Sequence, residues 1–144
     1  MATIVKGEGP KRAKIMLIGE APGATEIRLR KPFMGLSGEF LWKQLNKIGL
    51  TRKKVYVTNI VKEKVKGKLT EKQIKKWLPA LKKEISSVKP KIIVLLGETA
   101  AKYIPLDFAA TYLELPHPSA ARRFPKQKKI FMKGIRKLKG LLHG

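Results

Sequence analysis

The stretch that decides the fold is IMLIGEAPGATE at residues 15–26. Its apolar half ends at a Gly-Glu pair and breaks into a Pro-Gly turn, which is typical of a buried parallel strand that ends at the carboxyl edge of a sheet. Ligands bind at that edge in open α/β sheets. The turn carries two carboxylates, Glu20 and Glu26, although the chain has only ten acidic residues. An acid placed there indicates chemistry, and the plainer interpretation is that Glu20 caps a helix or pairs with a lysine.

The composition is that of a folded and strongly basic protein. The 144 residues are 43% hydrophobic, which suits one domain over residues 1–144 with a substantial core. Lysine and arginine number 33 against ten acids, so the formal net charge is +23. The self-repulsion of such a chain is relieved by a polyanion. Nucleic acid is therefore the first expected partner, and an anionic membrane surface is the second.

Several classes of site are excluded by the residues that are missing. The sequence has no cysteine, which removes disulfides, thiol nucleophiles and cysteine-ligated clusters. With only two histidines, His117 and His143, a protein metal site is not expected. The first residues do not form a signal peptide, and no apolar run reaches the length of a membrane span. We expect a soluble cytoplasmic protein.

Strands and helices alternate along the rest of the chain. Four short apolar runs predict strands, and the segments between them show helical periodicity. The fold class that follows is α/β: a three-layer α/β/α sandwich around a central, mainly parallel four-stranded sheet. The strands are predicted over 14–19, 55–61, 91–97 and 111–115. Helices are predicted over 38–48, 70–89 and from about 128 onward, with a short one over 99–104.

Local signals refine two of these helices. Ser37 is expected to be the N-cap of the helix over 38–48, and Thr70 with Gln73 forms a capping box for the next one. Pro79 lies inside that second helix and is expected to kink or interrupt it.

Polar side chains gather at one edge of the predicted sheet. Glu20 and Glu26 follow the first strand, Asn59 lies near the end of the second, and His117 follows the fourth, between two prolines. A buried amide such as Asn59 needs partners or a ligand. Phe33, in the loop after the first strand, is a core plug or a stacking platform, and His117 is a satisfied turn residue or a ligand contact. Together they indicate a ligand site.

Five short motifs occur here in the order typical of one family. They are the Gly-Glu-Ala-Pro-Gly turn at 19–23 with Glu26, KPFMG at 31–35, TNIVK at 58–62, the strand end at 96–97, and HPS at 117–119. In this order they resemble the uracil-DNA glycosylase superfamily, most closely its family 4, the thermostable bacterial and archaeal type. The resemblance extends from about residue 14 to residue 125.

The resemblance implies an activity and a partner. It implies removal of uracil from DNA by hydrolysis of the N-glycosidic bond of a flipped-out nucleotide, the first step of base excision repair. The expected partner is uracil-containing DNA, bound by a monomer associated with the nucleoid, and no cofactor is expected. Cleavage leaves positive charge on the sugar and negative charge on uracil. A carboxylate on the sugar side and hydrogen-bond donors on the base side stabilise both charges.

By position, the resemblance also implies roles for individual residues. Glu20 would orient the attacking water or stabilise the cationic sugar, and His117 would donate to uracil O2. Phe33 would stack on the base, Asn59 would hydrogen-bond O4 and N3, and Glu26 would crowd C5 and exclude thymine. Further contacts are expected from Ala21 to the base and from Ser37, Ser119, Arg122 and Arg123 to DNA.

One feature departs from the family. Family 4 carries four cysteines that hold an iron–sulfur cluster, whereas this sequence has none, and Glu63 stands roughly at the third cysteine position. The packing of Trp77 and Leu78, with the lysine-rich segment 62–69, is expected to replace the structural role of the cluster.

Two other functions stay open at this point. The first is a glycosylase that prefers hypoxanthine or another deaminated base. The second is a non-catalytic basic module that binds nucleic acid, although the joint presence of Glu20, Asn59 and His117 favours an enzyme. The side chain that would fill the space left by the flipped base is also open, with Ala121, Arg122 and Arg123 as candidates.

Overall fold

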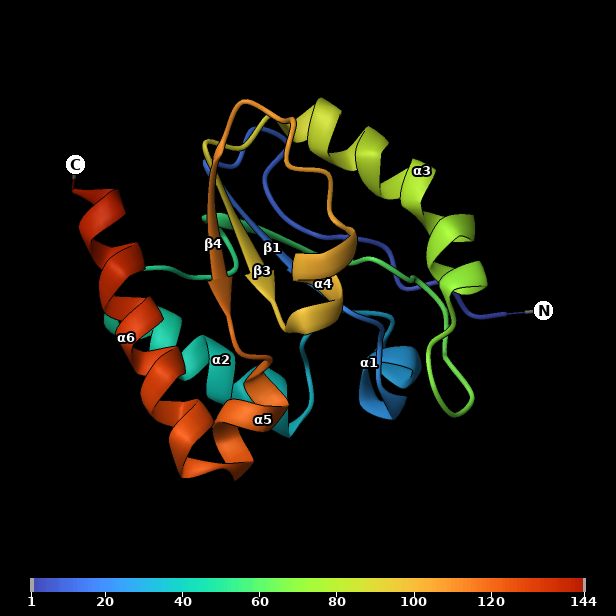
Figure 1. Ribbon diagram of the computed structural model, residues 1–144, viewed down its shortest axis with the longest axis horizontal. Helices are drawn as coiled ribbons and strands as arrows, with labels where there is room; N and C mark the ends of the chain where they lie inside the picture. The colour runs from blue at the N-terminus through green and yellow to red at the C-terminus, as the bar shows by residue number, and fades with distance from the viewer. Residues whose placement is uncertain (1, 144) are drawn as a thin grey trace.

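The computed structural model describes residues 2–143 and arranges them in three layers (Figure 1). The middle layer is a sheet of β1 (Ile15–Gly19), β2 (Val55–Asn59), β3 (Ile92–Leu96) and β4 (Thr111–Leu115). Neighbouring strands pair in parallel, in the order β2-β1-β3-β4. The predicted sandwich with a parallel four-stranded sheet is confirmed, and each strand lies within two residues of its expected bounds.

The outer layers are helical. Helices α2 (Leu36–Lys47) and α6 (Pro125–Leu142) cover one face of the sheet, and α3 (Glu71–Val88) and α4 (Glu98–Tyr103) cover the other (Figure 1). Two short helices, α1 (Ala24–Leu29) and α5 (Pro118–Arg123), lie at the end toward which the strands point. Among the helices of residues 2–143, none combines the length and the apolar composition that a membrane span requires.

Strand β1 lies in the middle of the sheet and is buried along its whole length. Ile15 and Leu17 pack in the apolar cluster under α2 and α6, whereas Met16 and Ile18 pack in the cluster under α3 and α4. Successive side chains of a strand point to opposite faces, so a strand covered on both sides needs an uninterrupted apolar run. This requirement explains the composition of the stretch at residues 15–19.

Several helix predictions need correction. Helix α2 begins at Leu36 with Gly35 as its N-cap, so the prediction of Ser37 as the cap is wrong. The capping box of Thr70 and Gln73 is confirmed. Helix α3 is not interrupted at Pro79, because Ile74, Leu81 and Ile85 bury the parts on both sides of the proline in one cluster. Helices α1 and α5 were not predicted.

Candidate active site

A cavity of about 170 Å³ opens at the carboxyl edge of the sheet. It is smaller than the ~300–1,000 Å³ typical of sites for drug-sized ligands, and so suits a single small ring. Its walls come from the segment after β1, the first turn of α2, the end of β2 and the residue that precedes α5. Six of the ten predicted site residues line it; the lining comprises Ala21, Gly23, Glu26, Phe33, Ser37, Gly38, Asn59 and His117.

Asn59 is the last residue of β2 and is almost completely buried, with 4% of its surface exposed. Its main-chain carbonyl accepts a hydrogen bond of 2.7 Å from Nζ of Lys62. No hydrogen bond joins its carboxamide to another described residue, and the carboxamide atoms keep some solvent access, because Arg52 Nη1 is the one fully buried side-chain polar atom without a partner among the described residues. Water can reach these atoms through the cavity, and a ligand that displaces this water has to replace its hydrogen bonds. The Asn59 amide therefore indicates a ligand that both donates and accepts hydrogen bonds.

Gly19 allows the amide and the aromatic ring of the cavity to come close together. A Cβ atom at this position would lie 2.5 Å from Cζ of Phe33 and 2.6 Å from Oδ1 of Asn59. Both distances are too short for nonbonded atoms, so any side chain at residue 19 would displace the two groups. The glycine of the Gly-Glu pair is thus required by the geometry of the cavity.

The backbone of Phe33 is held in place by contacts with α2 and with Arg52. Its φ of 55° lies in the left-handed region, which a non-glycine residue adopts only when its surroundings impose it. Its carbonyl accepts hydrogen bonds from Nε1 of Trp42, at 3.3 Å, and from Nη2 of Arg52. A Cβ at Gly38 would lie 2.2 Å from the same carbonyl group, so α2 packs directly against this backbone. The ring belongs to the apolar core and also forms a wall of the cavity.

Glu26 organises the loop that carries Phe33. Its Oε2 accepts hydrogen bonds from the main-chain N–H groups of Met34, at 2.8 Å, and Gly35, at 2.7 Å, and its Oε1 accepts one from Gly23 at 3.0 Å. Partial burial alone would raise the pKa of this carboxyl, but these hydrogen bonds outweigh burial and hold its pKa below the usual value. Glu26 is therefore ionised at neutral pH, and it ties the start of α1 to the start of α2.

The hydrogen bonds of His117 define which ring nitrogen carries the proton. The main-chain N–H of Ser119 donates to Nδ1 of His117 at 3.1 Å, so Nδ1 is an acceptor. Burial lowers the pKa of His117, and the charge of Glu26 opposes this only in part. A neutral imidazole with an accepting Nδ1 carries its proton on Nε2. His117 is thus a neutral Nε2–H donor, with its ring centroid 6.4 Å from that of Phe33.

Four of the predicted site residues lie outside the cavity. Glu20 lines a neighbouring hollow of about 810 Å³ that shares His117 as part of its wall. The Oγ of Ser119 lies 2.9 Å from Nδ1 of His117, and Arg122 and Arg123 are exposed on α5. The structure therefore separates the small cavity from a wider groove beside it. Ala121 is completely buried, so it is wrong as a candidate to fill the space left by a flipped base.

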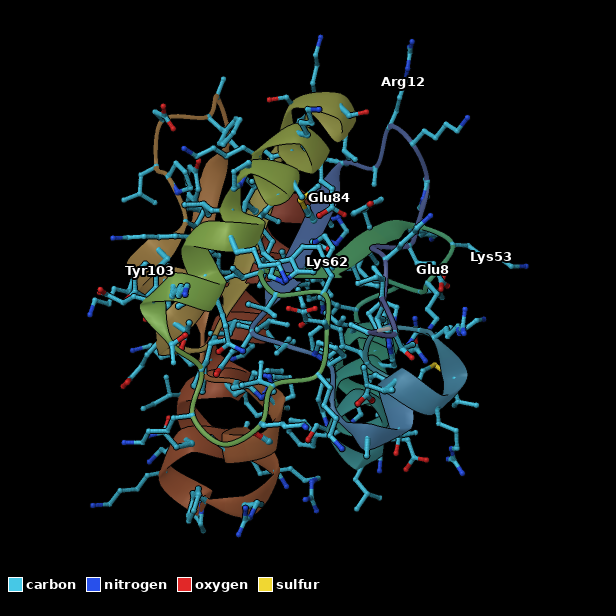
Figure 2. The ribbon with its side chains drawn as sticks, turned by 90° about the vertical axis from the view of Figure 1, so that its right-hand side faces the viewer. Glu8, Arg12, Lys53, Lys62, Glu84 and Tyr103 are labelled. Carbon is cyan, nitrogen blue, oxygen red and sulfur yellow. The ribbon has the colours of Figure 1, made fainter. Side chains whose placement is uncertain are left out.

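Lys62 is a site residue that the sequence did not reveal. It was assigned to a lysine-rich connection, yet it is buried and forms an ion pair of 2.5 Å with Glu84 of α3. Nζ of Lys62 also donates to Oγ1 of Thr58 at 2.9 Å, and the Tyr56 hydroxyl donates to Glu84 at 2.6 Å. Figure 2 shows the labelled side chains of Lys62 and Glu84 next to each other beneath α3. The TNIVK motif includes Lys62 but does not show that it is buried, because its partner is 22 positions away in the sequence.

Fold and site together define an α/β protein with one small cavity at the sheet edge, lined by an amide, an imidazole and an aromatic ring. The chain belongs to the uracil DNA glycosylase superfamily, whose family model matches residues 6–139.

Three similar proteins are named Type-4 uracil-DNA glycosylase. The one from Saccharolobus solfataricus is 41% identical over 103 residues, which cover 69% of this chain and 48% of that protein. The one from Sulfurisphaera tokodaii is 32% identical over 162 aligned positions, which cover 95% of this chain and 74% of that protein. The one from Pyrobaculum aerophilum is 37% identical over 100 residues, which cover 68% of this chain and 51% of that protein. The matched stretch thus spans about half the length of the first and third of these relatives.

The residues at the expected cluster region do not fit an iron–sulfur cluster. The sequence supplies no thiolate, and within residues 2–143 no group of three or more His, Asp or Glu side chains could hold a metal ion. Glu63 instead accepts hydrogen bonds from Nε1 of Trp77 at 3.2 Å and Nζ of Lys76 at 3.0 Å. These contacts join the segment after β2 to α3.

Proposed function

We propose that this chain removes uracil from DNA by hydrolysing the N-glycosidic bond of a nucleotide flipped out of the helix. The observation that carries the proposal is the carboxamide of the nearly buried Asn59, which forms no hydrogen bond to another described residue and lines a cavity shared with Phe33 and His117. The names of the relatives from three archaea support the same activity.

The carboxamide of Asn59 matches one edge of uracil. Its NH₂ group donates to O4 and its oxygen accepts from N3–H, so the pattern is complementary to uracil. Cytosine presents a donor at position 4 and an acceptor at N3. In the same amide orientation, the NH₂ group of Asn59 would meet a donor and its oxygen would meet an acceptor. Phe33 offers its ring face for stacking. We assign the exclusion of thymine to Glu26, whose carboxylate lines the same cavity.

His117 supports the departure of the base. When the bond between C1′ and N1 breaks, the bonding electrons stay on uracil and charge accumulates on O2. A fixed Nε2–H donor stabilises this charge without a proton transfer, and one preorganised donor of this kind is worth about 3–4 kcal/mol of barrier. Water adds to the sugar at C1′ and loses one proton, which balances the negative charge of the uracil anion. Glu20, in the hollow next to His117, is assigned to the sugar side, where its carboxylate stabilises the positive charge or orients that water.

The remaining assignments follow from charge and position. A net charge of +23 supports DNA as the partner. Ser37, Ser119, Arg122 and Arg123 are assigned to the DNA around the flipped nucleotide, and Ala21 to the base. The protein would act as a single-domain monomer at the nucleoid and start base excision repair.

Release of uracil from labelled oligonucleotides tests the proposal directly. The protein is incubated with strands that contain uracil, hypoxanthine or a mismatched thymine, and abasic sites are then cleaved with alkali. We expect scission of the uracil strand alone, and Asn59→Ala should abolish it while the salt-dependent affinity for DNA stays nearly unchanged. No scission of any strand would refute an enzymatic role, and preferential scission at hypoxanthine would replace uracil as the substrate.

A further inference from the structure

Arg52 lies in the turn before β2 and reaches the loop that carries Phe33. Its Nη2 donates to the main-chain carbonyl of Pro32 at 2.7 Å and to that of Phe33. The same nitrogen lies 3.2 Å from Sδ of Met34, and the guanidinium carbon lies 4.7 Å from the centre of the Trp42 ring. One side chain therefore binds two consecutive carbonyls that lie 20 and 19 positions earlier in the sequence.

Arg52 and Glu26 bind the two ends of one peptide group. The carbonyl of Phe33 accepts from Arg52, and the N–H of Met34, which belongs to the same peptide group, donates to Oε2 of Glu26 at 2.8 Å. A peptide group is planar, so binding at both ends fixes its orientation and with it the ψ angle of Phe33. Phe33 has a φ of 55°, a conformation that persists only where the surroundings impose it. A cation and an anion together impose it here.

The head group of Arg52 is placed at a cost. Its Nη1 is buried and has no hydrogen-bond partner among the described residues. Burial lowers the pKa of Arg52, and the charges of Glu8 and Glu26 oppose this. Enclosing a guanidinium with one nitrogen unpaired is unfavourable, so this placement needs a reason. A side chain that only bound phosphate would keep its head group in solvent, whereas one that holds the Phe33 loop has to lie where Arg52 lies.

We propose that Arg52 is a positioning residue for uracil release: by holding the Phe33–Met34 peptide group against Glu26, it keeps the Phe33 ring in place as the wall on which the base stacks. This role rests on the proposed function, because it takes a base in the small cavity as given. Phe33 also lines a second hollow, of about 440 Å³, together with Trp42 and Arg52. Without Arg52 the loop can relax toward this hollow, and a displacement of about 1 Å can cost about a hundredfold in rate.

Arg52→Ala and Lys53→Ala form a matched pair. Lys53 is exposed and extends away from the protein, so both variants lose one positive charge but only Arg52→Ala loses the loop contacts (Figure 2). We expect kcat for uracil release to fall about tenfold to a hundredfold in Arg52→Ala and to stay within about twofold in Lys53→Ala. The loss of a phosphate contact would reduce the slope of log affinity against log salt by about one, whereas we expect an unchanged slope in Arg52→Ala.

Two further comparisons separate positioning from folding. Added ethylguanidinium matches the end of the missing side chain and should restore part of kcat in Arg52→Ala, whereas ethylammonium, which has the same charge, should not. Arg52→Lys keeps the charge but lacks the planar fork of donors, so its kcat should stay about fivefold or more below that of the wild-type protein. If Arg52→Ala does not fold, the kcat and exchange comparisons use Arg52→Lys.

Hydrogen exchange tests the loop contact without DNA or catalysis. The main-chain N–H of Met34 and the indole N–H of Trp42, which donates to the Phe33 carbonyl, should exchange about tenfold faster or more in Arg52→Ala. The indole N–H of Trp77 in α3 is the reference. Unchanged exchange at Met34, unchanged kcat, or a reduced salt slope would overturn the proposal. If the wild-type protein releases no uracil, the proposed function is wrong, and the exchange rates still decide whether Arg52 holds the loop.

Discussion

The ammonium group of Lys62 holds the main-chain carbonyl of Asn59 at 2.7 Å and is itself bound to Glu84 of α3. Burial lowers the pKa of Lys62, although the charge of Glu84 opposes this. Removing two charges from water is costly, and a buried ion pair often adds nothing to stability. The network therefore has a positional role: it fixes the end of β2, so that the Asn59 carboxamide is aimed into the cavity.

This role predicts that stability and activity can be separated at Lys62. Lys62→Met removes the cation from the part-buried Glu84 carboxylate, to which Tyr56 and Thr58 still donate, and should lower the free energy of unfolding by about 1–3 kcal/mol. Lys62→Met combined with Glu84→Gln removes both charges and should recover most of this loss in urea unfolding. The double variant should still release uracil about tenfold to a hundredfold more slowly, because Asn59 is no longer held in position.

Lys82→Met serves as the control, since Lys82 is an exposed residue of the same helix. It should match the wild-type protein in both measurements. A double variant with wild-type kcat would show that Lys62 does not position Asn59.

Glu26→Gln tests the carboxylate that ties the cavity loop together. The amide removes the charge and turns an NH₂ group toward the N–H donors of the loop, so unfolding free energy should fall by about 1–3 kcal/mol. The pKa of Glu26 in the folded protein is below its ordinary value. Its stabilising effect is therefore complete above pH 4.5 and is lost as the pH falls through the folded-state pKa. Thermal unfolding between pH 3 and 7 should show a shallower acid decline in Glu26→Gln. If the stability of the wild-type protein and that of Glu26→Gln declined equally toward low pH, this role of Glu26 would be refuted.

His117 should be neutral at pH 7, with its proton on Nε2. Because burial lowers its pKa below 6.5, the neutral form should persist as the pH falls past that value, and uracil release should keep its rate there. Protonation at lower pH places a hydrogen on Nδ1 against the Ser119 N–H, so the rate should then decline. Nitrogen-15 NMR of the His143→Asn variant reports a single imidazole. A proton on Nδ1 at pH 7, or a midpoint of the His117 titration above pH 6.5, would contradict the assignment of His117 as a neutral Nε2–H donor.

The sheet could be predicted because its strands are continuous apolar runs, and the site could be predicted because polar residues end those runs. Asn59 and His117 were found in this way, and the cavity brings them together. Helices α1 and α5 have six residues each, too few for a helical period to be visible, and α4, which is equally short, was predicted from its place after the third strand. Lys62 could not be found, since a lysine is read as solvated unless its buried partner is known.

The contact between Glu63 and Trp77 predicts how the segment after β2 is held without a cluster. Hydrogen bonds from Lys76 and Trp77 lower the pKa of Glu63, whose side chain is 16% exposed. Trp77→Phe keeps the ring but removes the Nε1 donor, and should reduce unfolding free energy by about 1 kcal/mol. It should also speed hydrogen exchange in residues 62–69, where Val65 and Leu69 pack on the α3 cluster.

Lys76→Met is the matched control for this contact. The Lys76 side chain is 61% exposed, and surface ion pairs contribute little, so this variant should change stability by less than about 0.5 kcal/mol. If Trp77→Phe and Lys76→Met changed stability and hydrogen exchange equally, the ion pair of Lys76 with Glu63 would account for the anchoring of residues 62–69. Unchanged exchange in Trp77→Phe would show that apolar packing alone holds the segment. Faster exchange in Trp77→Phe but not in Lys76→Met would establish the indole hydrogen bond as the anchor between the end of β2, where Asn59 lies, and α3.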